Sequence, residues 1–465
     1  MSLQTALTAA LSGLRATQQQ AALVSHNISN ATTPGFVRKE LDLSTAVTGG
    51  LGQGVRVDGV ARRVDELLIR DARFEQSRYT AQEARASALA DYANVLGQPQ
   101  DERSVSTALA KLQQAFSTLR DQSDNEAAQA AVVDKADALV RRLHDTAAAA
   151  TAAQADAKGR LQSSVDQVNT ALVRVGELNG AIARQTAQGA DTSDLRDQRD
   201  RLLDQVSEEI GIRTYTRDTG EVVVMTRNGQ TLLDRELPAG AQPLQLVGND
   251  LMAGGKVISG NPDQDIQSGR IMGYAQAAFQ DMPRALAQLD QLAAGLVQQF
   301  QGAEADPTQP GLFTDAGAAY GSTAGLAGRI TVNDAVRTAT WKVQSGVQAT
   351  APLAPGDQTQ IDRYLGAFTA TRAFAAPDLP VSATLGEFAT SLVSTQQGYR
   401  TTAESDLTTR KISADALNNA RINRDGVNVD DEMQKLLLIE QSYGASAQVI
   451  QVAGRMLDTL LQLRN

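Results

Sequence analysis

Apolar residues recur at heptad steps at both ends of the chain. Over residues 3–28 they alternate steps of four and three, and over residues 436–460 steps of three and four. This spacing puts them on one face of a helix and predicts a coiled-coil seam at each end. The seam positions that we expect to form contacts are Leu3, Leu7, Leu14, Val24 and Ile28 in the first helix and Leu436, Ile439, Tyr443, Ile450, Leu457 and Leu460 in the last.

Signals at the ends of these two helices agree with the periodicity. The first helix should end near Asn27–Asn30, because Thr33-Pro34-Gly35 is a turn sequence. The last should begin after Asn428, a good N-cap, with three acidic residues in its first turn where the helix dipole favours them.

Very few charges interrupt either helix. Arg15 is the only charged side chain in residues 1–36. A helix that is apolar on several faces needs more than one neighbour. We therefore favour pairing of the two ends combined with packing against further copies. The alternative is that the two ends pair only with each other.

The body of the chain changes period once. No proline lies between Pro99 and Pro238, and this stretch predicts long helices, the last of them capped by Ser193 or Asp194. From residue 212 the period becomes two, which predicts strands at 212–215, 221–225, 231–233, 244–247 and 256–258. Helix returns at about 266–301 and again at about 360–421. Residues 305–358 are rich in Gly, Pro, Thr and Ala and are expected to be loops.

These segments predict a mainly α fold with an inserted β domain. We expect a long antiparallel helical bundle, terminal helices paired as a coiled coil, and a small β-rich outer domain. The predicted domains are a terminal helical domain (1–35 and 428–465), a long-helix bundle (36–211, 262–305 and 359–427), a β-rich insert (212–261) and an irregular segment (306–358).

Composition excludes several classes of protein. The net charge of -10 argues against nucleic acid and anionic membranes as partners. The absence of Cys excludes disulfides and thiol chemistry. No run of 18 apolar residues predicts a membrane span, and the first residues do not resemble a secretory signal. If the protein is exported, we expect a route that cleaves no leader.

Chemistry typical of an enzyme is also missing from the sequence. His26 and His144 are the only histidines, and neither belongs to a metal-binding motif. We interpret His26 as the end of a polar turn and His144 as a solvated helix residue. The charge run at residues 194–201 is interpreted as a solvated helix face with local ion pairs. We therefore predict no catalytic residue, no cofactor and no metal.

Several motifs resemble those of a known family. Ser25-His26-Asn27-Ile28-Ser29-Asn30, followed by Thr33-Pro34-Gly35-Phe36, resembles the N-terminal motif of flagellar rod, hook and hook-associated proteins, with His26 where Asn is usual. The segments at 54–65, 195–200 and 426–461 are similar to those of the hook-associated protein 1 family. The resemblance is weak over residues 305–380.

The resemblance implies a structural role outside the cell, in the flagellum, at the junction of hook and filament. The implied partners are other copies of the chain, the hook protein, the next junction protein with the filament, and a cytoplasmic export chaperone on the C-terminal segment. It also implies type III export without leader cleavage. Two alternatives remain: another axial protein of the hook or distal rod, and a secreted cell-wall hydrolase.

Overall fold

The computed structural model describes residues 3–48, 51–258 and 268–462. The chain divides into two compact units, which are described separately below. The first unit contains residues 1–79, 165–269 and 410–465, and the second contains residues 80–164 and 270–409. The helices α2 (Glu66–Leu96), α4 (Glu126–Ala187) and α11 (Leu385–Asp425) contribute residues to both units.

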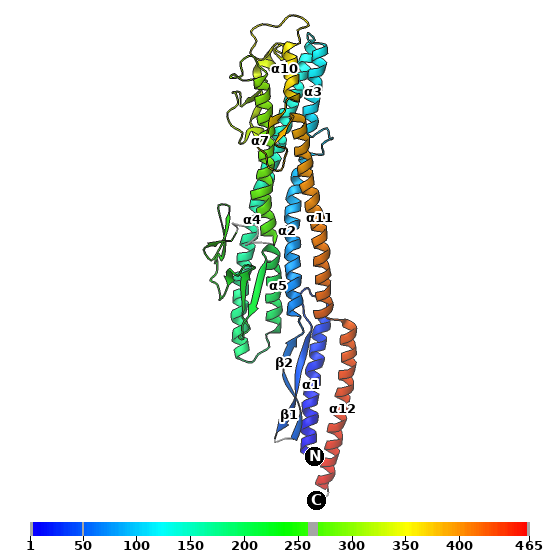
Figure 1. The fold of residues 1–465 in the computed structure, drawn as a ribbon. Coiled ribbons are helices and arrows are strands. Elements are labelled where there is room, and N and C mark those ends of the chain that lie inside the picture. The colour runs from blue at the N-terminus through cyan, green and yellow to red at the C-terminus, as the bar shows by residue number, and fades with distance from the viewer. Residues whose placement is uncertain (1–2, 49–50, 259–267, 463–465) are drawn as a thin grey trace. The chain divides into compact units, whose positions relative to one another are not determined.

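The two terminal helices pack side by side and antiparallel in the first unit (Figure 1). Helix α1 runs over Leu3–Ser29 and α12 over Val429–Gln462. The backbones approach closely at Gly13, where a Cβ atom would lie 3.5 Å from the Ser446 hydroxyl. The predicted pairing of the chain ends is therefore confirmed, as are the end of the first helix and the cap. Asn428 Oδ1 accepts the backbone N–H of Asp430 at 3.0 Å.

A long β-hairpin follows α1 and was not predicted from the sequence, which assigned these residues to the bundle. Strand β1 covers Lys39–Thr48 and β2 covers Leu51–Arg62, paired antiparallel. The hairpin packs on α1 (Figure 1). Gly54 permits this contact, because its φ is +110° and a Cβ atom there would lie 2.0 Å from Ser12 Oγ. Val55 N–H also donates to Ser12 Oγ at 3.0 Å.

The first unit also contains α5 (Ser193–Glu209) and two three-stranded antiparallel sheets. One sheet has β3 (Ile212–Thr216), β4 (Val222–Thr226) and β5 (Thr231–Leu233). The other has β6 (Leu244–Val247), β7 (Asp250–Ala253) and β8 (Lys256–Val257). The change of period at residue 212 thus predicted the start of the β region correctly, although β7 was missed. The predicted end of the last strand was one residue too long.

The second unit is a helical bundle with a continuous apolar core. Besides parts of α2, α4 and α11 it contains α3 (Val105–Asp121), α6 (Arg270–Gln276), a π-helical turn (Ala277–Asp281), α7 (Met282–Gly302) and α10 (Thr359–Thr369). Phe116, Phe300 and Tyr364 are fully buried, with ring centroids 5.4–6.0 Å apart. The prediction of a mainly α fold is confirmed.

Residues 303–384 are more ordered than their composition indicates. They form β9 (Phe313–Asp315), a 3-10 turn (Leu326–Gly328), β10 (Ile330–Val332), α8 (Asp334–Thr338), α9 (Lys342–Ser345), β11 (Arg372–Ala373) and β12 (Ser382–Ala383) around α10. Leu312, Phe313, Ile330 and Val336 are completely buried in the bundle core. The expectation of loops with little regular structure concerned residues 305–358. In that segment the regular elements are β9, the 3-10 turn, β10, α8 and α9, each of three to five residues, and they pack against the bundle core.

Candidate assembly site and the polar joint

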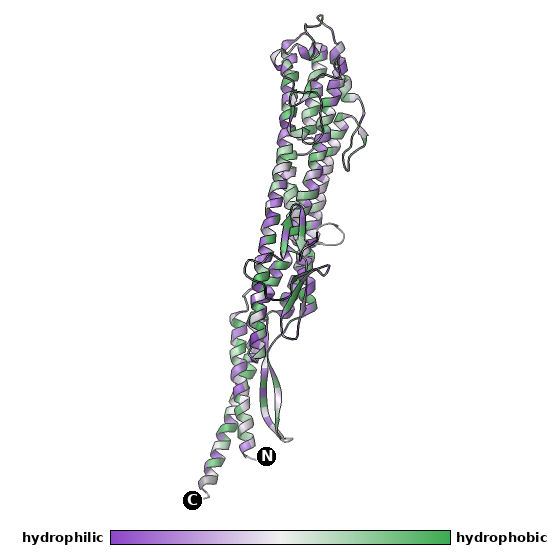
Figure 2. Ribbon diagram, turned by 90° about the vertical axis from the view of Figure 1, so that its left-hand side faces the viewer, coloured by the Kyte–Doolittle hydropathy of each residue, from purple (hydrophilic) through white to green (hydrophobic). Residues whose placement is uncertain are grey.

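Helix α12 contains many apolar residues along its length (Figure 2). Most of them are exposed. Among the α12 side chains that the structure describes, only Glu432 and Ala453 are buried. The exposed set includes Met433, Leu437, Leu438, Tyr443, Val449, Val452, Met456 and Leu457. We call these eight residues the α12 stripe.

The predicted seam residues divide into two groups. Val24 is buried, and Leu7, Leu14, Ile28, Leu436, Ile439 and Ile450 are partly buried within the first unit. Tyr443 and Leu457 are 42% exposed and belong to the α12 stripe. Leu3 and Leu460 lie in the two helices, but their side chains are outside the described part of the structure. Pairing with α1 thus covers only part of the predicted seam.

The end of α1 is connected to both β1 and α12 through one buried amide. Asn27 Nδ2 donates to the Lys39 carbonyl and to Glu432 Oε2, both at 2.9 Å. Lys39 N–H donates back to Asn27 Oδ1 at 3.2 Å. Both Asn27 and Glu432 are fully buried, and Lys435 donates to Glu432 Oε1 at 2.7 Å. The two terminal motifs that carried the family resemblance therefore meet at this point.

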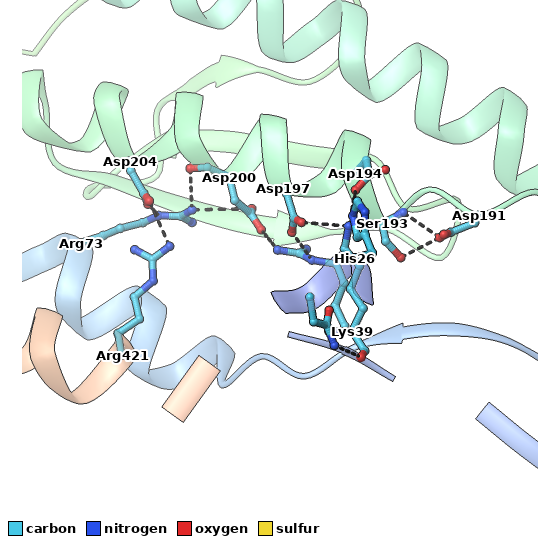
Figure 3. Close-up of polar contacts among 12 residues, drawn as sticks. His26, Lys39, Arg73, Asp191, Ser193, Asp194, Asp197, Asp200, Asp204 and Arg421 are labelled. Atoms are coloured by element: carbon cyan, nitrogen blue, oxygen red, sulfur yellow. Dashed lines mark hydrogen bonds and ion pairs between the residues drawn. The ribbon is translucent and has the colours of Figure 1, made fainter. Parts of the chain in front are cut away.

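The acidic face of α5 continues this contact as a row of ion pairs (Figure 3). Lys39 bonds Asp194 and lies 3.4 Å from Asp197. Arg62 Nε lies 2.8 Å from Asp197, and its Nη2 donates to Asp200 at 2.5 Å. We call the whole set the polar joint: Asn27, Lys39, Arg62, Arg73, Asp194, Asp197, Asp200, Asp204, Arg421, Glu432 and Lys435.

Helices α2 and α11 enter the polar joint through arginines. Arg73 Nε donates to Asp204 at 2.5 Å, and Arg421 Nη2 donates to the same carboxylate at 3.0 Å (Figure 3). Lys39 and Asp197 are almost fully buried, so these charges interact with little water between them. The prediction of a solvated helix face was wrong, because oppositely charged residues from distant segments cover it.

The carboxyl pKa values differ along the row. Burial alone would raise the pKa of Asp200, but Arg62 and Arg73 outweigh burial and lower it. Burial raises the pKa of Asp197, although Arg62 and Lys39 oppose the effect. The hydrogen bond from Lys39 lowers the pKa of Asp194. The polar joint is therefore built to hold Asp194 and Asp200 as anions.

The cap of α5 and the two histidines differ from expectation. Asp191, rather than Ser193 or Asp194, accepts from the first turn of α5, through the backbone N–H of Ser193 at 2.9 Å. His26 lies in the last turn of α1, 3.8 Å from Asp194 and against the Phe36 ring. His144 is not simply solvated, since its Nε2 lies 2.8 Å from the Ile330 carbonyl oxygen.

The polar joint connects α1, the β1–β2 hairpin, α2, α5, α11 and α12, and the α12 stripe is an exposed apolar surface. Within the described residues no group of three or more His, Asp or Glu side chains could hold a metal ion. None of the helices that the structure describes is long and apolar enough to cross a membrane.

Comparisons with known proteins agree with the motifs. A family model for the flagellar hook-associated protein FlgK helical domain matches residues 89–307. A model for the C-terminal region of flagellar basal body rod FlgEFG proteins matches residues 420–463. The second match contains Glu432 and the α12 stripe.

Similar curated proteins carry the name flagellar hook-associated protein 1. That of Salmonella typhimurium is 29% identical over 63% of this chain and 55% of its own, and that of Escherichia coli K12 is 28% identical over the same shares. The chain thus matches about half the length of these two relatives. That of Bacillus subtilis is 22% identical over 95% of both chains.

A solved structure, that of the flagellar hook junction protein FlgK from Burkholderia pseudomallei, is 19% identical. The likeness covers 53% of this chain and 46% of that one, with a TM-score of 0.45. The two family models and the curated relatives agree with the terminal motifs. The chain is therefore similar to the flagellar hook-associated proteins 1, through the helical-domain model at residues 89–307 and through the curated relatives.

Proposed function

We propose that the protein is a structural subunit of the bacterial flagellum that forms the junction between hook and filament. The observation that carries this proposal is the α12 stripe, which stays exposed after α1 and α12 have paired. Many exposed large apolar side chains on one helix are typical of a protein interface. In an axial assembly, neighbouring copies cover the stripe, and the seam residues Leu3 to Ile28 and Leu436 to Leu460 line the contacts.

The proposed partners follow from the same surface. Copies of the chain contact each other through the terminal helices, and the assembled layer lies between the hook protein and the next junction protein with the filament. Before export, a cytoplasmic chaperone binds the C-terminal segment, because an exposed apolar helix aggregates unless it is covered. The assembled protein lies outside the cell. The proposal includes no catalytic step, cofactor, nucleic acid or membrane.

One observation separates this role from that of a hook or rod protein. The model matched at residues 420–463 is named for basal body rod proteins and does not discriminate. The helical-domain model at residues 89–307 is named for the hook-associated protein and covers α3, α4 and α7. We therefore favour the junction over the hook or rod.

The test uses Leu438→Asp, with Leu457→Asp as a second variant, each supplied to cells that lack the gene. Leu438 is 64% exposed, so the monomer should fold normally. Burying an ionised carboxylate between two copies raises the free energy of assembly by roughly several kcal/mol unless the carboxylate becomes protonated. In an assembly of many copies this cost recurs at each contact. We expect hooks without filaments by electron microscopy. The matched control is Ile412→Asp on α11, which is 66% exposed and lies outside the stripe.

Secretion of each variant into the medium separates assembly from export. A folded, secreted variant that leaves hooks bare supports the interface. Normal filament numbers with Leu438→Asp and Leu457→Asp would show that the stripe is not the interface. Cells that keep their filaments after deletion of the gene would exclude the junction role itself.

A further inference from the structure

A pocket of about 750 Å³ lies in the second unit beside α7. Arg372, Phe374 and Val381 from the β11–β12 hairpin line it on one side, with Tyr320 and Thr323 opposite and Gln291 from α7. Its volume is in the range of small-ligand sites. Arg372 is the only charged residue among the lining residues.

Arg372 has only neutral hydrogen-bond partners among the residues that the structure describes. Its Nη1 donates to the Ala294 carbonyl at 3.1 Å, its Nη2 to Gln298 Oε1 at 2.8 Å and its Nε to the Ala373 carbonyl at 3.3 Å. A guanidinium has five N–H groups, so two remain for another acceptor. Burial lowers the pKa of Arg372, and only Tyr320 opposes this effect.

Asp378, the acidic residue of the β11–β12 hairpin, pairs with residues other than Arg372. Asp378 accepts from the Tyr399 hydroxyl at 2.7 Å and lies 3.4 Å from Arg284. Among the described residues, no carboxylate pairs with the partly desolvated guanidinium of Arg372. An unpaired desolvated charge lowers the stability of the folded protein. An incoming carboxylate would form charge-assisted hydrogen bonds there.

The walls of the pocket are held in place before anything binds. The Phe374 ring stacks on Phe388 with centroids 3.8 Å apart, and Phe374 N–H donates to the Val381 carbonyl at 2.8 Å. Gln288 Nε2 donates to the Pro377 carbonyl at 2.8 Å. The opposite wall is fixed by the Tyr320 hydroxyl, 2.7 Å from Thr323 Oγ1.

Glycine on α7 makes this arrangement possible. A Cβ atom at Gly295 would lie 3.1 Å from the Phe374 ring and 3.5 Å from Arg372 Nη1. A larger residue would clash with Leu385, 2.8 Å from that Cβ position, and would crowd the Phe374 ring. The pocket is therefore preformed, and a ligand that binds there has little ordering cost to overcome.

We propose that this pocket receives an acidic side chain from a second copy of the chain. The proposal rests on the proposed function, which brings copies into contact. Charge supports this occupant: the chain has 53 acidic and 43 basic residues, so a neighbouring copy presents an excess of carboxylates. The exposed side chains of Ala375 and Val381 provide apolar contact for the methylene groups of the incoming residue.

The chemistry is tested first on the full-length monomer with N-acetylglutamate α-amide as the probe. Its neutral analogue, N-acetylglutamine amide, is the ligand control. We expect saturable shifts of the Ala375, Ala376 and Val381 methyl resonances with the acidic probe only. Arg372→Gln should weaken binding by about tenfold or more, as expected for loss of a charge-assisted hydrogen bond. Arg363→Gln, an exposed arginine of α10, is the matched control and should bind normally.

A second variant guards against a folding defect in Arg372→Gln. Val381→Asp leaves all contacts of Arg372 in place and puts a carboxylate at the rim, where it should compete with the probe. The proposal is overturned if the wild type does not bind the acidic probe. It is also overturned if Arg372→Gln and Val381→Asp both bind the probe as well as the wild type does.

The occupant is tested in the assembled state. The chain contains no Cys, so Ala375→Cys can be labelled specifically with a benzophenone maleimide. In a mixture of ¹⁵N-labelled and unlabelled subunits, we expect photo-crosslinks between isotopes at a peptide containing Asp or Glu, reduced by Arg372→Gln. Assembly without such crosslinks excludes a second copy as the occupant and leaves the junction role intact. Failure of the wild type to assemble contradicts the proposed function, and the probe titration then still decides whether the pocket binds carboxylates.

Discussion

Helix α7 buries most of its apolar residues, whereas helix α12 leaves most of its apolar residues exposed. Twelve of the 21 residues of α7 are buried, including Leu289, Leu296 and Phe300. In the 34-residue α12, only Glu432 and Ala453 are buried among the side chains that the structure describes. Both helices are rich in apolar residues, so composition does not explain the difference.

The difference lies in what surrounds each helix. The bundle covers α7 on several sides, and the aromatic cluster at Phe116, Phe300 and Tyr364 completes its core. Helix α12 has α1 on one side and leaves the α12 stripe uncovered. The chain alone thus completes the bundle core, whereas the pairing of α1 and α12 leaves the α12 stripe exposed. This division suits a subunit that folds first and orders its ends on assembly.

Amide hydrogen exchange should show the largest contrast. We expect α12 in the monomer to open with a free energy of roughly 0–2 kcal/mol, since it buries few apolar contacts. Helix α7 should open only at the global stability, on the order of 5–15 kcal/mol. Exchange measured by mass spectrometry on dilute protein tests this. Equal protection of both helices in a verified monomer would remove the contrast.

The second largest contrast should be the loss of stability when a side chain is truncated in the bundle core rather than in the α12 stripe. Phe300→Ala removes a fully buried ring and should destabilise the bundle by about 3–5 kcal/mol. Leu438→Ala should change the stability of the monomer by less than about 0.5 kcal/mol, because the side chain is exposed. Urea denaturation followed by circular dichroism measures both. A large loss in Leu438→Ala would mean that the stripe is already packed in the monomer.

The polar joint should show an intermediate effect. Asp200→Asn removes the anion that bonds Arg62 and should destabilise the first unit by about 1–3 kcal/mol. Faster exchange in α5 and in the β1–β2 hairpin would locate the loss. Asp42→Asn, at an exposed hairpin position, is the control and should leave exchange unchanged. If the two variants behave alike, the ion pairs at Arg62 do not hold the hairpin.

Acid should change the contributions of Asp200 and Glu304 to stability in opposite directions, by the smallest amount. The arginines hold the folded pKa of Asp200 below 3.8, so its stabilisation is present above that pH and is lost as pH falls through the folded pKa. Glu304 in the second unit is the reverse case. Burial raises its pKa above 4.5, although the Tyr364 hydroxyl opposes this, so its contribution is fully present below pH 4.5 and is lost as pH rises.

Glu304 accepts the backbone N–H of Val347 at 3.1 Å, and this amide reports on it. Lowering pH from 7 to 4.5 should slow Val347 exchange after correction for its intrinsic rate. Glu304→Gln should abolish that pH dependence, while Glu387→Gln, at an exposed position, should retain it. An unchanged pH profile in Glu304→Gln would show that the carboxyl does not titrate in this range.

Local pattern was sufficient for the helices and most strands. The heptad seam around Val24 and Ile450, the cap at Asn428 and the turn at Gly35 each depend on neighbours within a few residues. The family motifs, including Asn27, were also visible in the sequence. The hydrogen-bond partner of Asn27 could not be predicted from the sequence, because Glu432 lies 405 residues away along the chain.

Three features were decided only by tertiary structure. The β1–β2 hairpin carries charges such as Asp42 and Arg56 among its apolar residues, and contact with α1 at Gly54 stabilises it. The acidic face of α5 looked solvated because Lys39, which pairs with Asp194 and lies near the buried Asp197, is 155 residues distant from Asp194 in sequence.

The segment at 306–358 looked like loops because it is rich in Gly, Pro, Thr and Ala, yet Phe313 and Ile330 are buried in the bundle core. The sequence by itself determined the periodic elements, the motifs and hence the resemblance to the family, because these depend on residues close together in the chain. The tertiary structure decided which charges are paired, which loops are packed and which apolar residues of α12 remain exposed. Those outcomes depend on contacts between distant segments, which a local pattern does not contain.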